Sequence, residues 1–143
     1  MKVSEKGLAL IKDFEGCALV PYKCPGGVLT IGYGHTRGVT KDMRLKPEDA
    51  DELLLRDLEI YENAVNRKIK RTLTQGEFDA LVSFIYNLGA GKLSGEFLSD
   101  INAGRTDAVC ARMKLYVKAG GKKLLGLERR RNAECALYKG GLP

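Results

Sequence analysis

Tryptophan is absent from this sequence of 143 residues, aromatic residues make up 7% of it, and histidine occurs once. Proteins that bind single-stranded nucleic acid stack bases on aromatic side chains, so the shortage of aromatics argues against that function. The four cysteines contain no C-x2-C pair and, with a single histidine, form no plausible zinc-binding set. We therefore expect no metal and no other cofactor.

Long apolar runs are absent as well. No stretch is long enough to span a bilayer, and the segment from Met1 to Ser4 lacks the apolar core of a signal peptide. We expect no stable membrane insertion, so a substrate outside the cytoplasm would require another component to release the protein. The cysteines of a protein made in the cytoplasm are expected to be reduced thiols, with a Cys17–Cys24 disulfide as the alternative.

The residues that are present fit an ordinary globular protein, with 44% hydrophobic and 29% charged residues. The length suits one domain, or two small lobes that share one core. The formal net charge of +6 favours attraction to polyanions such as nucleic acid, anionic cell-wall polymers or lipid surfaces. The sign of the charge does not choose among these partners.

Periodicity and end signals predict an α+β protein that is mostly helical. Apolar residues spaced by three and four predict a helix at 47–68, and the capping box Thr74-Gln75-Gly76-Glu77 predicts another that runs to about 88. Further helices are predicted to begin after Ser4 and to cover 94–103, 106–119 and 127–138. Gly120 and Gly121 are expected to end the helix at 106–119, which turns Met113 into the core. Short strands around Pro25-Gly26-Gly27 predict a small antiparallel sheet between about residues 18 and 40.

Glu15 is the candidate catalytic acid. Gly16 follows it at a point where a helix can end in a left-handed residue, so Glu15 is expected in the last helical turn. Carbonyl groups there carry partial negative charge and favour a protonated carboxyl group, which can act as a general acid. The alternative is a solvated glutamate at a helix end.

Glu15, Cys24 and Thr30 match the pattern Glu-x8-(Asp or Cys)-x5-Thr, and residues 30–36 read T-I-G-Y-G-H-T. N-L-G at 87–89 and G-L-E-R-R-R at 126–131 follow in order. In these features the chain resembles the phage-type lysozymes, the endolysins of glycoside hydrolase family 24. The resemblance implies one lysozyme-like domain over 1–143. Within it a sheet-bearing lobe at about 15–45 is joined by a linking helix at about 47–68 to a helical lobe at about 69–143, which includes the N-terminal helix.

The resemblance also implies hydrolysis of the β-1,4 bond between N-acetylmuramic acid and N-acetylglucosamine in bacterial peptidoglycan, which causes host cell lysis. Glu15 would protonate the leaving oxygen, while a group on the sheet side positions water or stabilises the oxocarbenium-like sugar. As a thiolate, Cys24 would act as a general base towards water, with Thr30 bonded to the same water, or as a nucleophile; otherwise Cys24 only packs. Many relatives have aspartate where this chain has Cys24. Because a free thiol is mostly neutral at pH 7, Cys24 is a poorer standing negative charge than a carboxylate.

Three further residues are expected to bind substrate or to support the site. His35 either holds its loop or takes a direct chemical part, and Asn87 either caps a helix or faces the cleft. By resemblance Arg129, ahead of Arg130, is the candidate to reach Glu15, where it would favour the ionised carboxylate. We expect Arg131 on a solvated face.

Two other functions remain possible on these residues. A lytic transglycosylase acts on the same bond with one glutamate alone, and a non-catalytic module that binds cell wall or nucleic acid would fit the positive charge. We expect a monomer made in the host cytoplasm. By resemblance a phage holin would release it to the periplasm.

Overall fold

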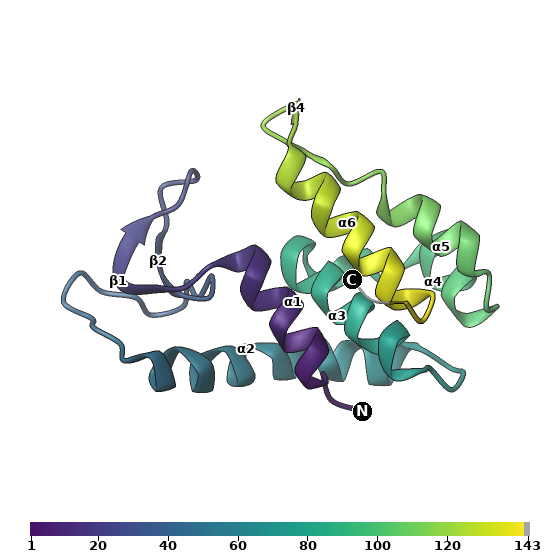
Figure 1. Cartoon of the computed structure of the whole chain (residues 1–143), viewed down its shortest axis with the longest axis horizontal. Helices are drawn as coiled ribbons and strands as arrows, with labels where there is room; N and C mark the ends of the chain where they lie inside the picture. The colour runs from purple at the N-terminus through teal and green to yellow at the C-terminus, as the bar shows by residue number, and fades with distance from the viewer. Residues whose placement is uncertain (142–143) are drawn as a thin grey trace. The chain divides into compact units, whose positions relative to one another are not determined.

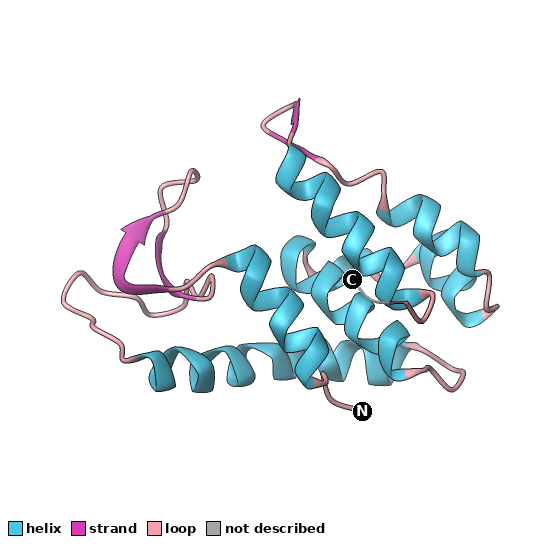
Figure 2. Ribbon diagram, viewed as in Figure 1, coloured by secondary structure: helices cyan, strands magenta, loops and turns pink. Residues whose placement is uncertain are grey.

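The computed structural model describes residues 1–141, which contain six α-helices, one short 3-10 helix and two small antiparallel sheets (Figures 1 and 2). The order is α1 (Glu5–Glu15), β1 (Ala18–Lys23), β2 (Leu29–Gly32), α2 (Pro47–Lys68), α3 (Gln75–Leu88), the 3-10 helix η1 (Ala90–Lys92), α4 (Gly95–Asn102), α5 (Thr106–Met113), β3 (Lys118–Ala119), β4 (Lys122–Lys123) and α6 (Leu125–Tyr138). The predicted α+β class, mostly helical with a small sheet, is confirmed. Within residues 1–141 no helix has the length and apolar character needed to cross a bilayer.

The chain divides into two compact units. The sheet unit is Ile11–Ile60, and the helical unit contains Met1–Leu10 and the described residues from Tyr61 onward. Both boundaries fall inside helices, α1 and α2. The predicted division into lobes of one domain stays a prediction.

Helix α3 is the centre of the helical unit. Its residues from Glu77 to Ile85 are buried without interruption, as expected of a helix that other helices surround. Helix α6 runs beside it (Figure 1). A Cβ atom at Gly76 would lie 2.3 Å from the carbonyl oxygen of Leu137, so only glycine permits this approach of α3 to α6.

Two predicted helix caps are confirmed in the helical unit. Thr74 Oγ1 accepts a hydrogen bond of 3.1 Å from the Glu77 backbone N–H, and Glu77 Oε1 accepts one of 2.8 Å from the Thr74 N–H. Ser4 caps α1, because its hydroxyl oxygen accepts from the Gly7 N–H at 3.3 Å.

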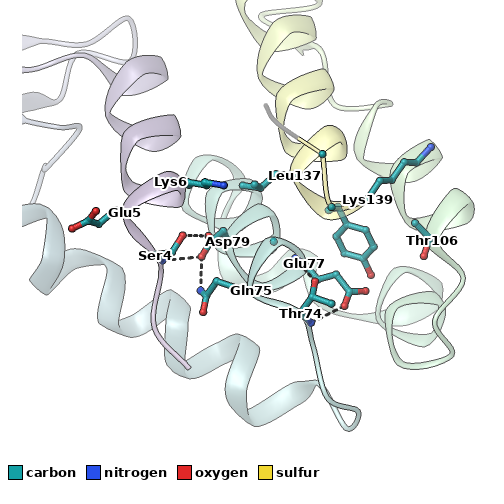
Figure 3. A pocket seen from close by; sticks show the side chains of 14 residues that line it. Ser4, Glu5, Lys6, Thr74, Gln75, Glu77, Asp79, Thr106, Leu137 and Lys139 are labelled. Carbon is teal, nitrogen blue, oxygen red and sulfur yellow. Dashed lines mark hydrogen bonds between the residues drawn. The ribbon is translucent and has the colours of Figure 1, made fainter.

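The start of α1 is fixed to α3 through the buried carboxylate of Asp79 (Figure 3). This carboxylate accepts hydrogen bonds from the Ser4 backbone N–H at 3.0 Å, from the Ser4 hydroxyl, and from Gln75 Nε2 at 2.8 Å. An open hollow of about 750 Å³ lies beside this contact, and none of the predicted site residues lines it.

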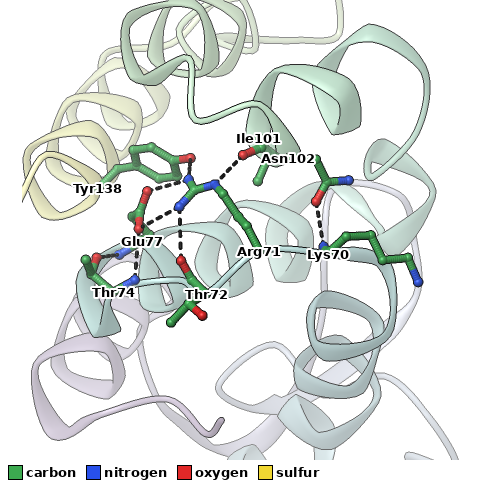
Figure 4. Close-up of polar contacts among 8 residues, drawn as sticks. All are labelled: Lys70, Arg71, Thr72, Thr74, Glu77, Ile101, Asn102 and Tyr138. Atoms are coloured by element: carbon green, nitrogen blue, oxygen red, sulfur yellow. Dashed lines mark hydrogen bonds and ion pairs between the residues drawn. The ribbon is translucent and has the colours of Figure 1, made fainter.

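Arg71 joins the start of α3 to the ends of α4 and α6 (Figure 4). Its guanidinium pairs with Glu77 at 2.6 Å and donates to the Ile101 carbonyl at 2.6 Å and the Tyr138 hydroxyl at 3.2 Å. Burial raises the pKa of Glu77, but Arg71 and the Thr74 N–H outweigh it and hold that pKa below its usual value. Burial raises the pKa of Tyr138 to about 12.

The segment after α5 differs from its prediction. The helix ends at Met113 instead of Ala119, and β3 and β4 form a hairpin around Gly120 and Gly121. Both glycines have positive φ, 58° and 78°, which is the combination that a two-residue hairpin turn requires. The glycine pair therefore turns a hairpin and does not stop a helix. Met113 is fully buried, as predicted.

The sheet unit contains the predicted antiparallel pair. Tyr22 pairs with Thr30 and Lys23 with Leu29, with an irregularity between Ala18 and Tyr22. Ile11, Ile31, Ala50, Leu54 and Leu58 form the buried apolar set of this unit. On its surface Lys12 of α1 pairs with Asp51 of α2 at 2.9 Å.

Candidate active site

Glu15 is the last residue of α1, as predicted, and it is half-buried. Gly16 follows with a φ of +70°, and its N–H donates to the Lys12 carbonyl at 2.9 Å. That bond closes the final turn, so a left-handed glycine ends the helix and leaves the Glu15 carboxyl group at its carbonyl end.

Cys24 and Thr30 lie at the two ends of the turn that connects β1 to β2. The Cys24 N–H donates to the Val28 carbonyl at 3.0 Å, and the Gly27 N–H donates to the Cys24 carbonyl at 2.7 Å. The Thr30 hydroxyl, almost fully buried, donates to the same Val28 carbonyl at 3.1 Å. The turn thus brings the predicted thiol and hydroxyl together within seven residues of chain.

Backbone amides make this turn favourable for a thiolate. Hydrogen bonds from the Val28 and Gly26 N–H groups lower the pKa of the Cys24 thiol; burial opposes them, and the Thr30 hydroxyl adds to them. Thr30 has a single hydroxyl proton, and a thiolate is a stronger acceptor than a carbonyl. We therefore expect that proton to turn from Val28 to Cys24 when the thiol ionises.

Sequence reasoning missed the amides of Gly26 and Val28 as functional groups. Lys23 precedes the thiol in the sequence, but adjacent strand residues point to opposite faces, so this ammonium group is not expected to favour the thiolate. The available signal was the turn Pro25-Gly26-Gly27 directly after the thiol, since glycines allow successive N–H groups to converge on one anion.

His35 contacts hydrogen-bond acceptors through both ring nitrogens. Nδ1 lies 2.7 Å from the Asp57 carboxylate on α2, and Nε2 lies 2.6 Å from the Arg37 carbonyl. Its backbone N–H and C=O exchange two hydrogen bonds of 2.9 Å with Ile31 of β2. These contacts favour the interpretation that His35 holds its loop in place.

In the helical unit the arginine triplet is arranged differently from the prediction for Arg131. That side chain is fully buried, pairs with Glu134 at 2.8 Å and donates to Asn87 Oδ1 at 2.8 Å. The prediction of a solvated Arg131 is wrong, because Glu134, three residues further along α6, and Asn87 of α3 both bind the buried guanidinium group. Phe84 lies under the same guanidinium, 5.0 Å from ring centre to Cζ.

Arg130 is buried as well, whereas Arg129 is exposed. The Arg130 guanidinium lies 3.3 Å from Glu134 and donates to the Ser83 carbonyl at 3.1 Å. Ser83 in turn donates its hydroxyl to Glu134 at 2.5 Å. We call Ser83, Asn87, Arg130, Arg131 and Glu134 the buried polar cluster.

Asn87 belongs to this cluster, while Arg129 does not. The amide oxygen of Asn87 accepts a hydrogen bond from Arg131. Burial raises the pKa of Glu134, and the two guanidinium groups act in the opposite direction. Residues 1–141 contain no group of three or more His, Cys, Asp and Glu side chains that could hold a metal.

Comparisons with known proteins agree with these features. Residues 12–134 match the family model described as phage lysozyme. The chain is 40% identical to the endolysin of Bacillus phage PZA over 100% of its own length and 57% of that protein. Among solved structures, the endolysin from Escherichia coli O157:H7 phage FAHEc1 superposes with a TM-score of 0.89 at 38% identity, covering 100% of this chain and 97% of that one. The muramidase domain of SpmX from Asticaccaulis excentricus gives 0.87 at 38%, covering 96% and 97%. The chain therefore belongs to the phage lysozyme family.

Proposed function

We propose that this chain is an endolysin that hydrolyses the β-1,4 bond between N-acetylmuramic acid and N-acetylglucosamine in peptidoglycan. The observation that carries the proposal is the turn in which Cys24 and Thr30 both bond to the Val28 carbonyl and backbone amides lower the pKa of the thiol, in the same unit as Glu15. Membership of the phage lysozyme family supports the same reaction.

In the proposed reaction Glu15 gives its proton to the glycosidic oxygen as the bond from that oxygen to the anomeric carbon breaks. The Cys24 thiolate takes a proton from water, whose oxygen then bonds to the anomeric carbon. The cycle leaves a Glu15 carboxylate and a Cys24 thiol, and proton exchange with solvent restores both. Thr30 holds the thiolate through its hydroxyl.

The other predicted residues have supporting roles in this proposal. His35 fixes the loop after β2 against α2, and Asn87 offers the NH2 group of its amide to the sugar chain while Arg131 holds its oxygen. Arg129, being exposed, is free to meet anionic groups of the polymer. The substrate partner is bacterial peptidoglycan. We further propose that the protein is a monomer, which size-exclusion chromatography with light scattering would check through its mass. We also propose that it acts in the periplasm after a holin releases it.

The test of the proposal is Glu15→Gln, which keeps the shape of the side chain and removes the transferable proton. Lysis of permeabilised Gram-negative cells, followed by turbidity, should fall by about 100-fold or more, the usual loss for a missing general acid. The matched control is Asp13→Asn, an exposed carboxyl group on the same helix, which should leave lysis unchanged.

The products of purified peptidoglycan identify the reaction. Hydrolysis leaves reducing muramic acid ends, which mass spectrometry distinguishes from the anhydro ends of a lytic transglycosylase. Anhydro ends would overturn the assignment of Cys24 as the base. If folded Glu15→Gln kept more than about a tenth of the lysis rate, Glu15 would be excluded as the acid.

A further inference from the structure

Two buried cysteines lie together in the helical unit and have no part in the proposed chemistry. Cys110 is on α5 and Cys135 on α6, and each is only 3% exposed. The Cys110 sulfur lies 3.8 Å from the Cys135 carbonyl oxygen, and the Cys135 sulfur lies 3.6 Å from the Cys110 carbonyl oxygen. These reciprocal contacts place the two residues opposite each other where α5 packs against α6.

We propose that Cys110 and Cys135 form an intramolecular disulfide in an oxidising compartment and that this bond fastens α5 to α6. All four cysteines are free thiols in the described structure, so the bond is a second covalent state of the same fold. Both residues lie outside the candidate active site, so the bond is independent of the proposed reaction.

The geometry suits a disulfide. Bridged cysteines need α-carbons about 4.4–6.8 Å apart and side chains directed at each other. Each sulfur lies within 3.8 Å of the backbone carbonyl oxygen of the opposite residue, which brings the two backbones near each other. Cys17 and Cys24 belong to the sheet unit, whereas Cys110 and Cys135 share one compact unit.

The two thiols differ in a way that orders the reaction. A hydrogen bond from Cys135 lowers the pKa of Cys110 to about 7, and the nearby Lys139 and Lys114 ammonium groups support this against burial. The same hydrogen bond and burial raise the pKa of Cys135. Cys110 is therefore the first nucleophile, because the thiolate is the attacking form.

The oxidant is a disulfide, either a small molecule or a thiol-oxidising protein. The Cys110 thiolate attacks one oxidant sulfur, which forms a mixed disulfide and releases the other sulfur as a thiolate. Cys135 then loses its proton and attacks the Cys110 sulfur, which releases the second thiolate. The protein loses two protons and two electrons, and the oxidant disulfide becomes two thiols.

The bond would close a loop between residues 25 positions apart, and this loop contains the β3–β4 hairpin. Cross-linking restricts the unfolded chain more than the folded one, so the oxidised protein should be more stable. For a chain of this size the melting temperature should rise by on the order of 10 °C.

The experiment compares reduced and oxidised full-length protein. The chain is refolded with glutathione and glutathione disulfide, free thiols are alkylated, and trypsin is added without reduction. Each cysteine lies in its own tryptic peptide, at 13–23, 24–37, 106–112 and 132–139. The expected result is peptide 106–112 joined to 132–139, with a melting temperature above that of the reduced protein.

Variants separate this bond from other oxidation. Cys110→Ala should remove both the joined peptide and the thermal gain, whereas Cys17→Ser, at an exposed thiol, should keep both. The comparison of reduced and oxidised wild type needs no variant, so a poorly folding Cys110→Ala does not prevent the test. Alkylated Cys110 and Cys135 after oxidative refolding, pairing of either with Cys17 or Cys24, or a bond without thermal gain would each overturn the proposal.

Discussion

The β1–β2 turn and the buried polar cluster hold their functional groups in opposite ways. In the turn, Cys24 and Thr30 are held by hydrogen bonds to backbone groups at most four residues away. In the cluster, hydrogen bonds join residues 44 to 51 positions apart, such as Asn87 with Arg131 and Ser83 with Glu134. The first arrangement depends on local chain geometry, and the second depends on the correct packing of α3 against α6. A mutation should therefore affect chemistry in the turn and stability in the cluster.

The largest effect is expected for Glu134→Ala. This carboxylate neutralises two buried guanidinium groups, so its removal should lower the free energy of unfolding by about 3–5 kcal/mol. Urea denaturation of the folded variant measures the loss. The control is Glu128→Ala, which removes only the surface pair with Lys123 and should cost less than about 1 kcal/mol. Equal losses in the two variants would mean that the cluster is not held by charge.

A smaller effect is expected for the His35–Asp57 contact of the sheet unit. The side chains are 13% and 23% exposed, and a hydrogen bond to a charged group at such a site contributes about 1.5–3 kcal/mol. The coupling between His35→Ala and Asp57→Ala in a double-mutant cycle measures it. Additive losses in the two single variants would show that the contact stabilises nothing.

The smallest expected effect, and the most specific one, is a shift in how the rate of lysis depends on pH. A base must be ionised, and the pKa of the Cys24 thiol is below its ordinary value, so lysis should rise with pH through that lowered pKa. Cys24→Asp should remain active and move this rise to lower pH. Cys24→Ser should be poor because a hydroxyl group does not ionise in this range.

The variant Thr30→Val tests the same dependence of lysis on pH. Loss of the hydroxyl donor should move the rise in lysis to higher pH, since Thr30 is one of the groups that lower the pKa of Cys24. Thr30→Ser, which keeps the hydroxyl, should restore the wild-type profile. If Ser and Ala at position 24 lysed cells as well as wild type, Cys24 would be a packing residue only.

Much of the fold could be predicted, because its signals are local. The helix from Pro47 to Lys68 follows from proline and acidic residues at one end, basic residues at the other and a steady apolar spacing. The cap of α3 follows from Thr74 and Glu77 alone. The hairpin after Met113 was missed because a Gly-Gly pair ends a helix and turns a hairpin equally well, and the sequence does not display the strand pairing that decides between them.

The candidate site could be predicted to a similar extent. The spacing of Glu15, Cys24 and Thr30 in the sequence indicated residues that lie at the end of α1 and in the β1–β2 turn. The burial of Arg131 could not be predicted, because an arginine run indicates solvent unless its partners are known, and Asn87 lies on another helix. Three-dimensional packing supplies those partners.

The donors to Cys24 have a consequence for how position 24 can change. Because Gly26 and Val28 contribute through main-chain N–H groups, every substitution at these positions except proline keeps the two donors. Any anionic group placed at position 24 inherits the same pair of ready-made donors. A change of Cys24 to aspartate would thus replace a thiolate with a carboxylate and leave the rest of the β1–β2 turn unchanged.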